Sequence, residues 1–133
     1  MIPALELGDT HSFSWTLTGS DLDAYIEASG DRNPLHTDDA FAQSVGLEGR
    51  IAHGLFTLGR IGMALESWGG DAYDLLELTA RFAKPLYIGD ELRCVARVVS
   101  TDAVEGSIIV ECSVESSRNE HTLTHCRAVL RHH

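Results

Sequence analysis

The chain of 133 residues has little basic charge. Nine arginines and a single lysine, Lys84, stand against twenty acidic residues, so the formal net charge is −10. Such a surface repels phosphate backbones and anionic headgroups, which argues against nucleic-acid and membrane partners. No apolar run approaches the roughly 20 residues of a membrane span, and residues 1–6 lack the basic and apolar regions of a secretion signal. We therefore expect a cytoplasmic protein.

Cysteine is also scarce, and its spacing excludes two common kinds of site. Cys94, Cys112 and Cys126 are odd in number and far apart, which fits neither a disulfide framework nor a zinc site. Each lies in an alternating apolar segment, so we expect small buried core residues. His121 and His125 are four residues apart in a strand pattern, which would separate them by roughly 13 Å, too far for one metal ion. No metal site is predicted.

The residues that are present suit one folded domain over 1–133, because 44% of them are hydrophobic. Apolar residues alternate over 13–17, which predicts a first strand. A short helix is expected over 21–29, capped by Thr18 or Ser20 and ended by Gly30.

Two further helices are expected before the middle of the chain. Thr37 resembles the N-cap of a short helix through Gln43. The segment from His53 to Trp68 has almost no polar face, and such a helix is normally buried on all sides. It nevertheless contains three glycines, each costing about 1 kcal/mol against alanine, which suggests that a backbone or a ligand comes very close. These are Gly54, Gly59 and Gly62.

The second half of the chain alternates between apolar and polar residues. The alternating segments are 76–82, 92–99, 108–114 and 126–130, with turn signals at 89–90, 105–106 and 118–119. This pattern predicts an antiparallel meander with one apolar face. Together with the apolar helix it predicts an α+β fold in which the sheet curls around the helix.

Residues 29–36, Ser-Gly-Asp-Arg-Asn-Pro-Leu-His, carry the main chemical signal. Fully extended, the chain would separate Asp31 from His36 by roughly 16 Å. Gly30, Asn33 and Pro34 favour a turn that folds them together. A carboxylate and an imidazole beside an apolar pocket can activate water and move a proton at the carbon next to a thioester. From spacing alone, a purely structural role is favoured, with Asp31 capping a turn and His36 buried against it.

A second signal is Ile51-Ala52-His53-Gly54, where the apolar helix begins. Unpaired N–H groups at a helix N-terminus can stabilise a negative oxygen, and Gly54 has no side chain to obstruct it. Tight packing is the alternative role for Gly54. His53 on its own suits a helix-start residue without chemistry, yet we keep it, with Asn33 and Gly54, among the candidate oxyanion- or substrate-binding residues.

Two cations lie close together in Arg81-Phe82-Ala83-Lys84-Pro85. Arg81 and Lys84 could bind the phosphates or pantetheine arm of coenzyme A. Ordinary solvated surface charges are an equal alternative.

At this point the residues resemble a known family. Residues 25–36 with Ala40 resemble the hydratase-2 motif of MaoC-like dehydratases, which include the (R)-specific enoyl-CoA hydratases. Residues 49–55 and 82–90 resemble the same family, so the similarity covers nearly the whole chain. Because Gly-Asp-x-Asn-Pro-x-His is a specific element, the resemblance favours a catalytic role for Asp31 and His36.

The resemblance implies a hot dog fold and a homodimer whose sheets join edge to edge. It implies reversible hydration of a trans-2-enoyl-CoA to the (R)-3-hydroxyacyl-CoA, for β-oxidation or polyester synthesis, without metal or redox cofactor. Asp31 and His36 would activate water and handle the α-proton, and the Gly54 amide would bind the thioester oxygen. Alternatives are a 3-hydroxyacyl-acyl-carrier-protein dehydratase, an acyl-CoA thioesterase and, from another class, a non-catalytic acyl-binding subunit.

One position departs from the family pattern. Some members have a serine that supports the active-site loop where this chain has Gly62. We expect altered hydrogen bonding near the loop. With Gly59, this glycine could also widen an acyl tunnel.

Overall fold

The computed structural model describes residues 4–133. Residues 1–3, which belong to the segment predicted not to be a secretion signal, lie outside this range. Within it, no helix combines the length and the apolar character required to cross a bilayer.

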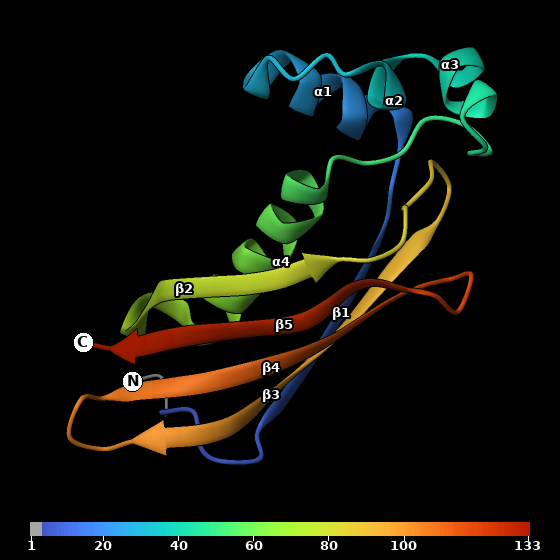
Figure 1. Ribbon diagram of the computed structural model, residues 1–133. Helices are drawn as coiled ribbons and strands as arrows, with labels where there is room; N and C mark the ends of the chain where they lie inside the picture. Colours follow the sequence, from blue (N-terminus) through green and yellow to red (C-terminus); the bar gives the residue numbers. More distant parts are fainter. Residues whose placement is uncertain (1–3) are drawn as a thin grey trace.

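Five strands form one antiparallel sheet in the order β1-β3-β4-β5-β2 (Figure 1). Their bounds are β1 Thr10–Thr16, β2 Tyr73–Phe82, β3 Glu91–Asp102, β4 Ser107–Ser116 and β5 His121–His132. All five were predicted, although most extend beyond the predicted segments. The turns at Gly106 and Asn119 were also predicted, and both residues have positive φ angles, 70° and 60°.

The meander was predicted correctly only for β3, β4 and β5. The turn at 89–90 does not join neighbouring strands, because β2 pairs with β5 and β1 pairs with β3. The chain therefore crosses the sheet between Phe82 and Glu91. As a result β2 is an edge strand, and no strand within residues 4–133 pairs with its other side.

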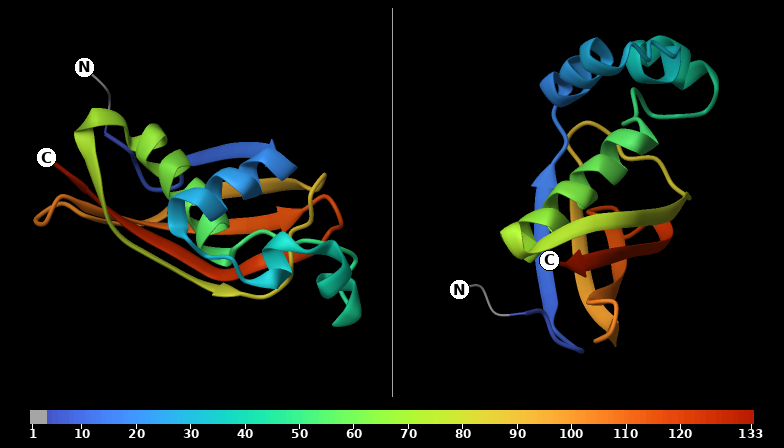
Figure 2. Two further views of the ribbon diagram at one scale, coloured as in Figure 1. Left: turned by 90° about the horizontal axis from the view of Figure 1, so that it is seen from above. Right: turned by 90° about the vertical axis from the view of Figure 1, so that its left-hand side faces the viewer.

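Helix α4, Gly54–Gly69, lies along the concave face of the sheet, with β1 and β2 curling up on either side (Figure 2). Ile61, Leu65 and Ala64 are buried between helix and sheet. The prediction that this helix is buried on all sides is wrong, because Leu55 is 64% exposed and Met63 48%. The exposed apolar stripe faces outward beside edge strand β2.

Strand β2 departs from simple alternation. Its register with β5 shifts between Leu75 and Glu77, so Leu75 and Leu78 pack against the core while Leu76 is 46% exposed. A bulge of this kind bends a strand and turns one side chain to the other face.

Three short helices precede α4: α1 Gly19–Ser29, α2 Pro34–Thr37 and α3 Asp39–Ser44. Thr18 caps α1 and forms a reciprocal capping box with Asp21, as one of the two predicted caps. Thr37 is not the cap of α3, because it ends α2. Asp38 caps α3 through a hydrogen bond from the Phe41 N–H, since a carboxylate accepts that bond more strongly than a hydroxyl.

The three cysteines lie side by side on the concave face of β3, β4 and β5. Cys94 and Cys126 are buried, Cys112 is half-buried, and all three are free thiols. Hydrogen bonding to Cys112 and burial raise the pKa of the Cys126 thiol, so it stays protonated and unreactive. The prediction of core residues is confirmed.

Candidate active site

The loop after α1 folds back on itself through short hydrogen bonds. Gly30 ends α1 with a φ of 74°, in the left-handed region. The Asn33 N–H donates to Asp31 Oδ1 at 3.1 Å, and the Leu35 N–H donates to Asn33 Oδ1 at 3.0 Å. Pro34 then begins α2 with its φ already suited to a helix. This turn is what carries His36 back toward Asp31.

The orientation of His36 is fixed by the main chain. Its Nδ1 lies 2.8 Å from the carbonyl oxygen of Ile51. Because a carbonyl can only accept, Nδ1 must carry the hydrogen, which leaves Nε2 as a free base. The Ile51 N–H in turn donates to the Leu35 carbonyl at 3.1 Å. Two hydrogen bonds therefore join α2 to Ile51, in the extended segment before α4.

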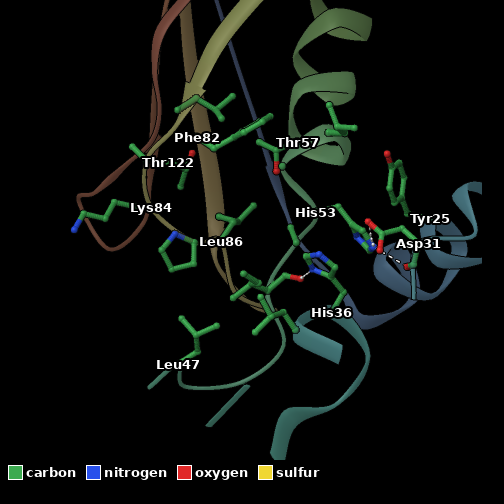
Figure 3. A pocket seen from close by; sticks show the side chains of 18 residues that line it. Tyr25, Asp31, His36, Leu47, His53, Thr57, Phe82, Lys84, Leu86 and Thr122 are labelled. Carbon is green, nitrogen blue, oxygen red and sulfur yellow. Dashed lines mark hydrogen bonds and ion pairs between the residues drawn. The ribbon is translucent and has the colours of Figure 1, made fainter. Parts of the chain in front are cut away.

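The structure brings together Asp31, His36 and also His53. One ligand atom from each lies within 4.8 Å of the other two, and Figure 3 shows the three side chains grouped on one side of the pocket. The Asp31 side chain is 51% exposed, so solvent reaches its carboxylate. A carboxylate and an imidazole, each able to take up and return a proton, therefore face one small volume.

His53 is the buried member of this group, with a side chain only 3% exposed. Its Nε2 lies 3.2 Å from the Asp31 carbonyl oxygen and 4.0 Å from Asp31 Oδ2. Its ring stacks on the His36 ring, with centroids 3.7 Å apart and planes at 23°. Burial is the largest effect and lowers the pKa of His53; the hydrogen bond to the Asp31 carbonyl, the next largest, raises it, and the nearby His36 lowers it further.

These three residues open onto a pocket of about 530 Å³. Its walls are mainly apolar, and they come from α1, α2, the start of α4, the end of β2 and β5. The lining residues are Tyr25, Asp31, Leu35, His36, Leu47, Ile51, Ala52, His53, Gly54, Leu55, Thr57, Phe82, Ala83, Lys84, Pro85, Leu86, Thr122 and Leu123.

Gly54 begins α4 at the wall of this pocket. A Cβ on Gly54 would lie 2.7 Å from the Phe82 ring, so only glycine fits without displacing that ring. No hydrogen bond within residues 4–133 uses the Gly54 N–H. A free amide at a helix N-terminus favours an incoming negative oxygen.

Of the other predicted site residues, only one lines the pocket. Lys84, in the loop after β2, lines the pocket, whereas Arg81, near the end of β2, does not. Asn33 also lies outside the lining, and its side chain is occupied as the N-cap of α2. The structure thus gives Asn33 a structural role at this loop.

Arg50 is a residue that the sequence analysis missed. Its Nε donates to the His36 carbonyl at 2.7 Å and its Nη2 to Asp23 Oδ1 at 2.8 Å. Its own N–H donates to Asp39 Oδ1 at 2.9 Å. Arg50 therefore links α1, α2 and α3. The only sign of this role in the sequence is that Arg50 directly precedes the Ile51-Ala52-His53-Gly54 segment.

Asp31, His36 and His53 have the ligand types of a transition-metal site, but their geometry suits one ion poorly. A histidine binds metal along a lone pair in its ring plane. The stacked rings of His36 and His53 direct such lone pairs nearly parallel, so the two cannot converge on one ion about 2 Å away.

The family model for the MaoC like domain matches residues 6–120. The chain belongs to this family. The MaoC-like domain here is 41% identical over 106 residues to 3-hydroxyacyl-thioester dehydratase Y of Mycobacterium tuberculosis; that match covers 73% of this chain and 37% of that protein. It is 28% identical over 120 residues to the mitochondrial 3-hydroxyacyl-[acyl-carrier-protein] dehydratase of Arabidopsis thaliana, over 90% of this chain and 71% of that one.

Among solved structures, this MaoC-like domain resembles the R-hydratase PhaJ1 of Pseudomonas aeruginosa in its unliganded form. The two superpose with a TM-score of 0.85 and 26% identity, over 96% of this chain and 82% of the other. The predicted hot dog fold is thereby confirmed, and the family to which the chain belongs includes proteins named as hydratases and as dehydratases.

Gly62, where some family members have a serine, does not lie beside the active-site pocket as expected. A Cβ on Gly62 would lie 3.4 Å from Leu75 and Leu78 of β2, and Gly59 and Gly62 line a separate groove of about 420 Å³ between α4 and β2. Neither glycine lines the pocket beside Asp31, so within this chain they do not widen it.

Proposed function

We propose that this protein catalyses the reversible hydration of a trans-2-enoyl-CoA to the (R)-3-hydroxyacyl-CoA, with Asp31 and His36 as the catalytic pair. One observation carries the proposal. An ionisable carboxylate and a histidine with a free Nε2 meet at the end of an apolar pocket, beside a helix whose first amide is unpaired.

The bond changes follow from that geometry. A water between Asp31 and His36 gives up a proton to the pair as its oxygen attacks the β-carbon. The C=C π electrons move toward the thioester carbonyl. The pair then returns a proton to the α-carbon, which forms the new C–H bond. Water is thus added across the double bond, and no electron leaves the substrate, so the reaction requires no redox cofactor.

The Gly54 amide is proposed to stabilise the intermediate. As the α-carbon gains electron density, negative charge develops on the thioester oxygen. A preorganised N–H donor at such a position contributes roughly 3–4 kcal/mol of transition-state stabilisation. The Gly54 N–H has no hydrogen-bond partner among residues 4–133, so it is available to the incoming oxygen.

The proposed substrate has an apolar acyl group and a charged carrier. Leu35, Leu47 and Leu86 supply apolar pocket wall, which suits a hydrocarbon chain. Lys84, at the same pocket, is the candidate contact for a coenzyme A phosphate or pantetheine arm. The structural neighbour named an R-hydratase supports the (R) product.

We further propose that the protein is a homodimer through edge strand β2. The free side of β2 offers unpaired main-chain groups, which invite pairing with another strand. Beside it lie the exposed side chains of Leu55, Met63 and Leu76. A second copy related by a twofold axis would extend the sheet and cover this apolar surface.

The test is a direct assay. Purified protein is mixed with trans-2-enoyl-CoAs of several lengths, loss of the conjugated thioester absorbance is followed, and the product is analysed on a chiral column. We expect (R)-3-hydroxyacyl-CoA from the wild-type protein and a rate lower by about 10²- to 10⁴-fold in Asp31→Asn and in His36→Ala, with the dimer intact. Full activity in either variant contradicts the assignment.

The dehydratase named among the relatives is the second candidate, because the carrier can be acyl carrier protein instead of coenzyme A. Comparing one 3-hydroxyacyl group on both carriers decides between them. A thiol reagent in the same assay detects thioesterase activity as free coenzyme A. Binding of acyl-CoA without any turnover would indicate a non-catalytic acyl-binding subunit.

A further inference from the structure

His53 is a buried titratable group that the proposed mechanism does not use. The other histidines outside the catalytic pair are partly or fully exposed, whereas His53 is 3% exposed. It is packed among the Tyr25 ring of α1, Asp31 of the following loop and His36 of α2. Lys84 is the one other charged group that lines the same pocket.

The contacts of His53 determine which nitrogen carries its hydrogen. Nε2 faces the Asp31 carbonyl oxygen at 3.2 Å, and a carbonyl can only accept, so Nε2 is the donor. Nδ1 is then a bare acceptor, and among residues 4–133 it has no hydrogen-bond partner and no access to solvent. A neutral ring fits these surroundings, because burial lowers the pKa of His53.

The same residue also connects to the other half of the site. His53 immediately precedes Gly54 and is the N-cap of α4. Its side chain holds the Asp31 backbone, and its ring face lies 3.7 Å from His36, while its main chain leads directly to the Gly54 amide. A shift of His53 therefore changes the distance between the acid–base pair and the amide.

We propose that His53 is a positioning residue: its Nε2–H holds the Asp31 carbonyl and so keeps the Asp31–His36 pair in register with the Gly54 amide. The kinetic consequences of this positioning role rest on the proposed function. The contact itself is a property of the folded protein and can be tested without any substrate.

Two substitutions separate the hydrogen bond from the ring. His53→Phe keeps a ring to stack on His36 but loses the donor. His53→Gln loses the ring but has an amide N–H at a similar reach. Misplacing a catalytic group through loss of such a bond costs about 10- to 100-fold in rate. His11→Phe is the matched control, because His11 is also partly buried and stacked, on Trp68 at 5.6 Å, but does not line the pocket.

The kinetic readout is kcat and KM for enoyl-CoA hydration, with melting temperatures to confirm folding. We expect His53→Phe to lose about 10- to 100-fold in kcat with KM within about threefold, and His53→Gln to keep at least about a third of kcat. His11→Phe should match the wild type. Normal kcat in His53→Phe, a glutamine variant as slow as the phenylalanine variant, or a loss confined to KM would each overturn the proposal.

The second readout is the imidazole ¹⁵N spectrum of the wild-type protein without ligand. We expect His53 neutral and protonated on Nε2 at pH 6.5, the ordinary midpoint of histidine. A neutral ring with its hydrogen on Nδ1 would refute the contact, because Nε2 could then not donate to the Asp31 carbonyl. If the wild-type protein hydrates no enoyl-CoA, the proposed function fails while this spectrum still decides the role of His53.

Discussion

In the sheet, apolar side chains are buried on one continuous face, whereas the segment from α1 to the start of α4 is held mainly by polar contacts. Val98, Val110 and Leu130 are fully buried against their neighbours on adjacent strands. Asp31 and Asn33, in contrast, are exposed and keep their places through short hydrogen bonds.

The difference indicates that stability and chemistry are separable in this fold. Burial of apolar area is non-directional and tolerates small shifts, but it supplies most of the folding free energy. Hydrogen bonds contribute less, about 1 kcal/mol each, yet they fix direction. A catalytic pair requires fixed orientations of its side chains. It therefore lies on the hydrogen-bonded segment between α1 and α4, at one end of the sheet. Substitutions in the two regions should therefore have opposite signatures.

The largest effect on stability is expected in the sheet. Leu92→Ala removes a side chain that is fully buried in β3 and is expected to lower the free energy of unfolding by about 3 kcal/mol. For a chain of this size that corresponds to a fall of roughly 10 °C in melting temperature. Below the transition, kcat should stay within about twofold of wild type. A large loss of kcat in the folded variant would mean that the regions are coupled.

An intermediate effect, with the opposite signature, is expected at Arg50. Arg50→Met removes the donors to the His36 carbonyl and to Asp23. Bonds to a charged group are worth about 1.5–3 kcal/mol, so we expect roughly a tenfold fall in kcat with a modest loss of stability. Arg32→Met is the control, because the Arg32–Glu27 pair is exposed on both sides and such pairs contribute about 0–1 kcal/mol. Equal kinetics in the two variants would show that Arg50 does not position His36.

The smallest effect is expected at Asn33. Asn33→Ala loses the cap of α2 and should cost about 1 kcal/mol of stability, while Asn33→Ser, which also caps well, should restore it. Because serine lacks the amide, it also tests the predicted contact with substrate. Activity restored by serine supports a cap only, and activity lost equally in both variants indicates a substrate contact through the Asn33 amide.

Local pattern was enough to predict the strands and the helices α1, α3 and α4, but it missed the short helix α2 and predicted only part of the strand pairing. Period-two alternation identified the strands, since each needs only its own buried face. The pairing of β2 with β5 depends on how the sheet curls around α4, and the turn at 89–90 carried no information on that. The exposed stripe at Leu55 and Met63 was missed for a related reason: an apolar helix beside an open sheet edge looks in sequence like one that is fully enclosed.

The site divides in the same way. The turn residues around Asn33 predicted that Asp31 and His36 approach each other, because that geometry is local. His53 lies 22 residues from Asp31 along the chain, and Arg50 lies 27 from Asp23. Such long-range contacts leave no local spacing signal. The burial of His53 and the hydrogen bonds of Arg50 therefore become visible only in the three-dimensional structure.

One double-mutant cycle tests most directly whether Asp31 and His36 act on the same water. The hydration rates of Asp31→Asn, His36→Ala and the double variant are compared with wild type on one enoyl-CoA. Groups that work as a unit are not additive, so we predict that the double variant is no slower than the slower single variant. Losses that multiply in the double variant, or a single variant with wild-type activity, would contradict a shared water.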